Sequence, residues 1–263
     1  SMFYYDLVLG HRWVLGEERL LRGCEHHRHA ERIPLAEATR LLMNRGTGLL
    51  LARARLERKP GSADDADFAG RNIAKAQLAL GDALLTALGR YHWSCLERER
   101  RLEAVSGDWP WLDDVRRHHV EGVAFKLHPR RTETVSAELA QRFDEVAATA
   151  LRLWLWLESR RLGEAFVSAR DYARCPRDLC PETNPWRNWL IHLQRFGLAS
   201  CLRPGALRHP RERVLRALAL MLWEPRVLAD PADLEFLQGV LDSRAEGGPE
   251  LLSAYGALWR RCS

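Results

Sequence analysis

The chain has 263 residues, of which 46% are hydrophobic and 29% charged, which is the balance of a folded globular protein and excludes extensive disorder. No apolar run approaches the ~20 residues of a membrane span, and no secretion signal is apparent, so we expect a cytoplasmic protein that makes no membrane contact. The net charge of +5 permits an acidic partner without requiring one.

The first twenty residues differ in pattern from the rest of the chain. Aromatic and β-branched residues between Phe3 and Gly16 surround a turn signal at Gly10 and His11. Runs of this kind around a glycine are typical of a β-hairpin. We therefore predict that residues 1–20 form a short hairpin, either a remnant or the edge of a sheet.

The remainder of the sequence has helical periodicity, with Pro and Gly between the segments. The fold class that this predicts is mainly α, a helical bundle preceded by the short hairpin. Residues 21–174 would form the bundle, and residues 175–263 a helical extension packed on it. The expected helices cover residues 34–59, 67–88, 91–105, 135–162, 184–196, 210–223, 231–241 and 249–259, the fourth of these being the central one.

Polar residues and glycines interrupt the first long helix at Asn44, Arg45, Gly46 and Gly48. A glycine inside a helix costs about 1 kcal/mol relative to alanine, so its presence favours either close helix packing or close approach of the backbone to a ligand. In the second case Asn44 would orient the ligand and Arg45 would bind an anionic group.

Other polar residues are expected at the same cleft. Lys75 and Asp82 are seven positions apart and share a helix face, and Tyr91 and His92 follow the end of that helix. Lys75 would bind an anionic group and Tyr91 would stack on the ligand. Lys126 and its neighbours would add a further polar pair.

An alternative site involves Arg187 and His192. Their spacing resembles the signature of HEPN ribonucleases, in which His is the general base and Arg stabilises the phosphate across a dimer. On a helix these two positions are about 140° apart and flank a groove. The same pattern also suits an exposed arginine and a half-buried histidine on an amphipathic helix.

Two further patterns do not predict a catalytic or metal site. Residues 24–29 contain four Cys and His side chains, but adjacent ligands cannot all converge on one metal ion, and we expect a solvated loop. Ser62 is followed by Asp64, Asp65 and Asp67, which we interpret as the N-terminal cap of a helix because acidic residues are favoured there.

A further set of stretches is Tyr5-Asp6-Leu7, Val14-Leu15-Gly16, residues 41–51 (LLMNRGTGLLL), Lys75-Ala76, residues 80–85 (LGDALL) and Tyr91. These stretches resemble the C-terminal part of bacterial nucleotidyltransferase-like proteins of the DNA polymerase β-like superfamily. The resemblance implies a helical, HEPN-like substrate-binding domain that follows a small sheet. The Gly-Ser and Asp-x-Asp elements of that sheet, which hold the catalytic metal, are missing.

This resemblance implies the helical half of a larger protein or a truncated relative, which binds a nucleotide, another small molecule or a partner protein. We expect no cofactor in the chain itself, and Mg²⁺ with a nucleotide only if a catalytic partner domain exists. The chain alone is not expected to be an enzyme. The first alternative is a metal-independent ribonuclease or its inactive relative, a homodimer acting on RNA. The second is an interaction protein that recruits a partner through the edge of the hairpin.

Overall fold

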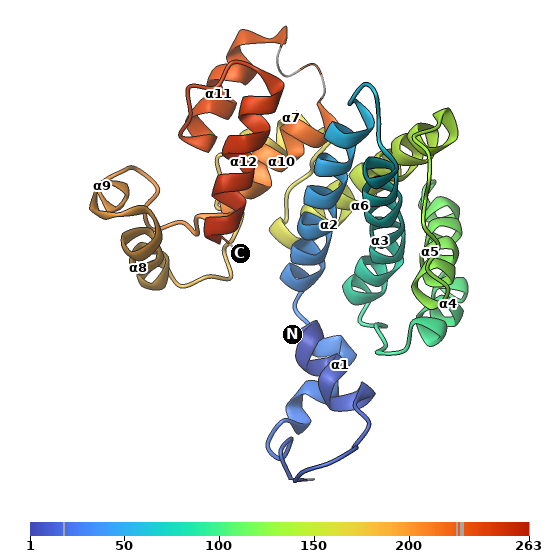
Figure 1. Cartoon of the computed structure of the whole chain (residues 1–263). Helices are drawn as coiled ribbons and strands as arrows, with labels where there is room; N and C mark the ends of the chain where they lie inside the picture. The colour runs from blue at the N-terminus through green and yellow to red at the C-terminus, as the bar shows by residue number, and fades with distance from the viewer. Residues whose placement is uncertain (18, 225, 227–228, 263) are drawn as a thin grey trace. The chain divides into compact units, whose positions relative to one another are not determined.

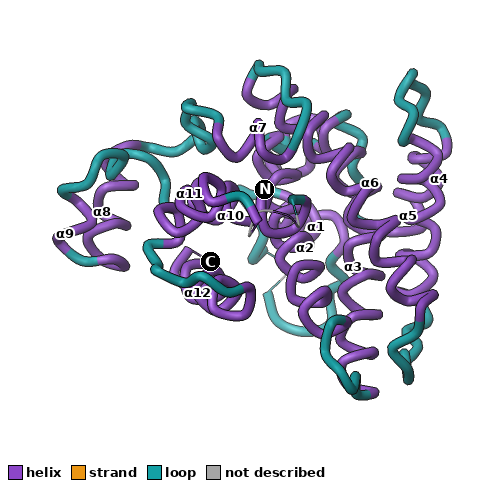
Figure 2. Tube along the Cα trace, turned by 90° about the horizontal axis from the view of Figure 1, so that it is seen from above, coloured by secondary structure: helices purple, strands orange, loops and turns teal. Residues whose placement is uncertain are grey.

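The computed structural model describes residues 1–17, 19–224, 226 and 229–262, and within these ranges the secondary structure is helical. Figure 2 shows helices and loops without a strand in the described part of the chain. The prediction of a mainly α fold is therefore confirmed. The chain divides into two compact units, Ser1–Arg161 and Leu162–Ser263, which we describe separately. The boundary predicted from sequence, between residues 174 and 175, lies within the second unit.

The predicted hairpin is wrong, because helix α1 occupies Met2–Gly10. Ser1 caps this helix by accepting a hydrogen bond from the backbone N–H of Tyr4. Met2, Tyr5 and Leu9 follow a three-to-four residue spacing and pack together with Ala30, Ile33 and Tyr91. The aromatic and β-branched composition suggested a strand, but burial of one helical face decides the conformation here.

The first unit is a helical bundle in which α3 lies between α2 and α5 (Figure 1). α3 is buried along most of its length, so it occupies the central position that we had assigned to the segment 135–162. α6 packs on α2, since Thr39 donates a 2.5 Å hydrogen bond to Glu158 and the Arg53 guanidinium lies over the Phe143 ring. The helices are α2 (Leu35–Leu56), α3 (Ala63–Ala87), α4 (Cys95–Glu103), α5 (Leu112–Leu127) and α6 (Ala137–Leu162).

The two ends of α3 follow the local chemistry of the sequence. Ser62 and Asp65 form a capping box, in which each side chain accepts a hydrogen bond from the backbone N–H of the other residue. The prediction of a capping cluster after Gly61 is therefore confirmed. At the other end Gly89 has a φ of 68°, the left-handed conformation that commonly terminates a helix.

The second unit is built around α10, which packs against α7, α11 and α12. α8 and α11 begin as the sequence predicts, with Asn184 and Asp230 as capping residues and proline in the first turn. None of the described helices of either unit has both the length and the apolar character needed to cross a membrane. The helices are α7 (Ala169–Arg174), α8 (Pro185–Phe196), α9 (Leu198–Cys201), α10 (Arg211–Trp223), α11 (Pro231–Leu241) and α12 (Gly248–Cys262).

Candidate functional site

A buried ion pair between Asp82 of α3 and Arg98 of α4 forms the centre of a polar cluster in the first unit. Arg98 Nε lies 2.9 Å from Asp82 Oδ1, and the two side chains are only 3% and 9% exposed. The contact is ionic and not a well-aligned hydrogen bond, since neither atom has a hydrogen-bond partner. Burying a charge is costly unless an opposite charge lies against it, so each of these residues requires the other.

Two tyrosines and Asp6 of α1 extend this cluster. The Tyr91 hydroxyl donates a 3.1 Å hydrogen bond to Asp6 Oδ2 and accepts one from Arg98, whose guanidinium lies 4.9 Å from the centre of the Tyr91 ring. The Tyr5 hydroxyl donates to the Tyr91 carbonyl. Burial and the two nearby carboxylates raise the pKa of Tyr91, so that hydroxyl keeps its proton. These contacts fix α1 on the bundle.

His119 of α5 closes the cluster from the third side. Its Nδ1 donates a 2.9 Å hydrogen bond to the Leu78 carbonyl. A Cβ added to Gly81 would lie only 2.3 Å from the same nitrogen. The same Nδ1 is 3.9 Å from Asp82 Oδ1. Burial lowers the pKa of His119 to about 4, and the ring is therefore neutral near pH 7. Gly81 thus allows a histidine to pack directly against α3.

Two further cations, Arg45 of α2 and Lys126 of α5, act on the buried Asp82 carboxylate, and we call them the cationic rim. Burial raises the pKa of Asp82 to about 6, while Arg98 and both rim residues act to lower it. Arg45 is half-buried and Lys126 is exposed. Within the described parts of the chain, neither rim residue forms an ion pair with a carboxylate. Both side chains therefore carry a positive charge that no carboxylate of the described chain neutralises.

The predicted cleft residues are placed unequally. The structure brings Arg45, Asp82 and Tyr91 to one cluster, although the buried Tyr91 ring is covered by Arg98 and is not open to a ligand. Asn44 and Lys75 are exposed, and neither side chain bonds to another described residue.

Two further features of the predicted cleft serve local structure. His92 Nδ1 accepts a 3.1 Å hydrogen bond from the Ser94 backbone N–H, immediately before α4. A Cβ on Gly48 would lie 2.5 Å from Asn72 Oδ1, so this glycine serves close packing of α2 on α3. Of the two explanations that the sequence left open for the glycines, the structure favours close helix packing at Gly48.

The alternative pair lies on α8 in the second unit. Arg187 is exposed, whereas His192 is buried with both ring nitrogens engaged. His192 Nε2 donates to the Arg208 carbonyl at 3.2 Å, and Nδ1 accepts from the Ser200 hydroxyl at 2.7 Å. Burial also lowers the pKa of His192. A general base needs a nitrogen that is free to take a proton from substrate, so the arrangement does not favour the ribonuclease role.

The Cys- and His-rich residues 24–29 form a short turn of 3-10 helix at Glu25–Arg28. The His27 ring stacks on Tyr4 with centroids 4.9 Å apart, and His29 pairs with Glu31. Across the described residues, no group of three or more Cys, His, Asp or Glu side chains is placed to hold a metal ion.

Sequence reasoning missed Asp6, Arg98 and His119 as members of the cluster. Asp6 did give a signal, because it is a single charge inside an otherwise apolar run of α1. Arg98 gave none, since it lies among the many charges of α4 and only the fold shows that its side chain is buried.

No protein family, no curated protein and no solved structure matches the chain. The function of the protein must therefore be inferred from the arrangement of its side chains and from the resemblance of its sequence.

Proposed function

We propose that the chain is a nucleotidyltransferase-associated helical protein that binds a nucleotide or a similar anionic substrate without a complete catalytic site of its own. The observation that supports this is the cationic rim, Arg45 and Lys126, two cations without a carboxylate partner that both act on the buried Asp82. The stretches that contain Arg45 and Asp82 are also among those that resemble nucleotidyltransferase-like proteins. In this proposal phosphate oxygens contact the rim.

In this proposal the buried Asp82–Arg98 pair does not bind the ligand. Asp82 and Arg98 neutralise each other, so the rim cations keep their charge for a ligand. Arg45 can bind two phosphate oxygens through its planar guanidinium, whereas Lys126 supplies a flexible single charge. Transfer of a nucleotidyl group would then depend on acidic residues of a separate partner domain, which would bring Mg²⁺.

Thermal unfolding with ATP tests this proposal. A ligand that binds only the folded state raises the melting temperature by an amount that grows with the logarithm of its affinity. We expect ATP to stabilise the unmodified protein and the Arg45→Gln and Lys126→Gln variants to lose most of that response. Each change removes one charged contact, which corresponds to about tenfold in affinity.

Lys59→Gln is the matched control, because Lys59 is an exposed lysine beyond the end of α2 and outside the rim. It should respond to ATP as the unmodified protein does. Lys75→Ala reports whether the binding surface extends two turns further along α3, as the sequence alone suggested. The proposal is wrong if the rim variants and Lys59→Gln respond equally, or if ATP has no effect on the unmodified protein.

A further inference from the structure

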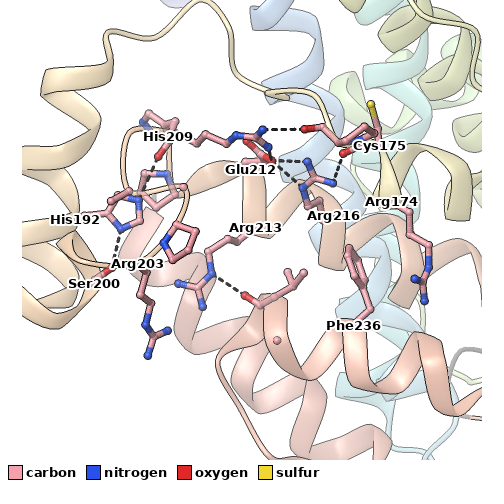
Figure 3. A pocket seen from close by; sticks show the side chains of 18 residues that line it. Arg174, Cys175, His192, Ser200, Arg203, His209, Glu212, Arg213, Arg216 and Phe236 are labelled. Carbon is pink, nitrogen blue, oxygen red and sulfur yellow. Dashed lines mark hydrogen bonds and ion pairs between the residues drawn. The ribbon is translucent and has the colours of Figure 1, made fainter.

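The second unit contains a pocket of about 690 Å³, built from residues between Arg174 and Val240 (Figure 3). Its wall combines apolar side chains, such as Phe236 and Val240, with five arginines and a single glutamate. A cavity of this size, mostly apolar with a few polar groups, is typical of a site for a small organic molecule. The excess of arginine raises the question of which positive charges are already neutralised.

Two of the five arginines are bound within the protein. Arg216 donates from Nε to Glu212 at 2.9 Å and from Nη1 to the carbonyls of Ala173 and Cys175, each at 2.6 Å. Arg208 lies 3.1 Å from the same Glu212 carboxylate. Figure 3 shows these bonds converging on one side of the pocket. These two side chains connect α10 to the segment after α7, and their guanidinium groups are already hydrogen-bonded within the protein.

A third arginine is also neutralised. Arg174 lies 2.8 Å from Asp233, whose side chain is 1% exposed and also pairs with Arg170. The Arg174 guanidinium additionally covers the Phe236 ring at 4.8 Å. This arginine therefore joins α7 to α11, and its charge is balanced.

Arg213 differs from these three. Its Nε donates a 2.7 Å hydrogen bond to the Val240 carbonyl, which fixes the guanidinium without neutralising it. The Phe196 ring lies 5.7 Å from the guanidinium carbon. No carboxylate forms an ion pair with Arg213 among the residues that the structure describes. Burial lowers the pKa of Arg213, and Asp242, which lies beyond ion-pair distance, raises it in part. A half-buried cation held in place by a carbonyl keeps its attraction for an anion.

Arg203 supplies a second charge close to Arg213, near enough to lower the pKa of the Arg213 guanidinium. Its only ion pair in the described residues is with Asp242 at 3.0 Å, and the two side chains are 56% and 57% exposed. Exposed pairs of this kind contribute about 0–1 kcal/mol, so Asp242 is easily exchanged for another anion. In Figure 3 the labelled Arg203 and Arg213 side chains extend in the same direction from the histidine side of the pocket.

We propose that this pocket binds a small organic phosphate, with its phosphate oxygens on Arg213 and Arg203 and its apolar part against Val240 and Phe236. A phosphate presents several oxygens to two guanidinium groups, which a single carboxylate does less well. This site is separate from the cationic rim of the first unit and does not depend on the function proposed for it.

Calorimetric titration with phenyl phosphate tests the site, because this probe joins a phosphate to an apolar ring. Benzoate has the ring with a carboxylate, inorganic phosphate has the anion alone, and phenol has no full charge. We expect phenyl phosphate to bind more tightly than the other three. Arg213→Gln should weaken its binding about tenfold or more, the loss expected for a charged hydrogen bond.

Gly239→Leu provides a second variant that removes no charge. Gly239 lines the pocket, and a Cβ built on it has nothing within 4 Å, so a leucine adds bulk at the pocket wall without a clash at its Cβ. Phenyl phosphate binding should fall in this variant while circular dichroism stays unchanged. Arg187→Gln removes an exposed arginine outside the pocket and should bind normally.

Arg45→Gln separates the two sites, because it alters the rim and should leave phenyl phosphate binding unchanged. If Arg45→Gln alone loses the probe, the rim is the site and the pocket proposal is wrong. The pocket proposal is equally wrong if Arg213→Gln and Gly239→Leu, both folded, bind like the unmodified protein, or if phenyl phosphate does not bind. Tighter binding of benzoate would replace the phosphate class with a carboxylate.

Discussion

Asp82–Arg98 in the first unit and Arg213 in the second are both buried or half-buried charges, yet their partners differ. Arg98 lies against a carboxylate of its own chain, whereas Arg213 is held by a carbonyl, which carries no full charge. The first arrangement is complete without a ligand, and the second is not. The partner of a buried charge, more than the charge itself, therefore distinguishes a structural site from a binding site.

The largest effect is expected from breaking the buried pair. Arg98→Leu removes the one cation in direct contact with the Asp82 carboxylate among the described residues, at a site that is almost closed to water. Removing one partner of a buried pair costs about 3–5 kcal/mol, and we expect a loss of this size in the free energy of unfolding. Urea denaturation at neutral pH measures it.

Two further variants show whether that loss comes from the buried charge. Arg100→Leu removes an arginine of the same helix that pairs with Glu97 at an exposed position, and it should cost less than about 1 kcal/mol. The double variant Asp82→Leu/Arg98→Leu should be more stable than Arg98→Leu alone, because no charge remains buried. A double variant less stable than the single one would show that Asp82 needs no cation.

The next effect concerns the close packing of α5 on α3. A Cβ on Gly122 would lie 2.3 Å from the backbone nitrogen of Leu78, and backbone cannot move aside as a side chain can. We expect Gly122→Ala to destabilise the first unit by about 2 kcal/mol, since overpacking outweighs the gain in helix propensity. Thermal unfolding measures this change, and a stabilised variant would mean that the two helices separate easily.

The pH dependence of stability should report on Asp82 and His119, two titrating members of the cluster. The pKa of Asp82 is raised to about 6 in the folded protein from 3.8, so between these values the folded state binds the extra proton. Its contribution to stability is therefore lost as pH rises through this range. Asp82→Asn should gain stability relative to the unmodified protein by about 1 kcal/mol per pH unit between roughly pH 4 and 6.

His119 should show the opposite sign. Its pKa falls from 6.5 to about 4 on folding, so in this window the unfolded state binds the extra proton, and stability rises with pH. As pH rises from about 4 to 6.5, the free energy of unfolding of His119→Gln should therefore fall relative to that of the unmodified protein. If both differences have the same sign, the assignment of these two groups is wrong. Comparison with the unmodified protein cancels groups such as Asp6 and His118, which titrate in both.

Much of the helical fold was predictable because helix signals are local. Ser62 before an acidic turn, and Pro185 and Pro231 after capping residues, determine where three helices begin. The hairpin prediction was wrong for a reason that the sequence does not contain. Tyr5 and Tyr91 are 86 positions apart, and only their contact shows which face of α1 is buried.

The candidate sites were less predictable for the same reason. Asp82 was identified from its helix position, but its partner Arg98 lies on another helix among many charged residues. Arg213 looks like any arginine of an amphipathic helix until the fold places the Val240 carbonyl against it. Periodicity indicates which face of a helix is buried, but it does not identify the counter-charge that a long side chain reaches.

The smallest effect is expected from Gly239→Ala, which tests whether the pocket wall at this residue is open. A Cβ on Gly239 has nothing within 4 Å, unlike one on Gly122, and the helical backbone accepts alanine without strain. Alanine is the better helix former, so we expect a gain of roughly 0.5 kcal/mol by thermal unfolding. A clear loss of stability would mean that a neighbouring side chain fills the space beside Gly239 and that this part of the pocket is closed in solution.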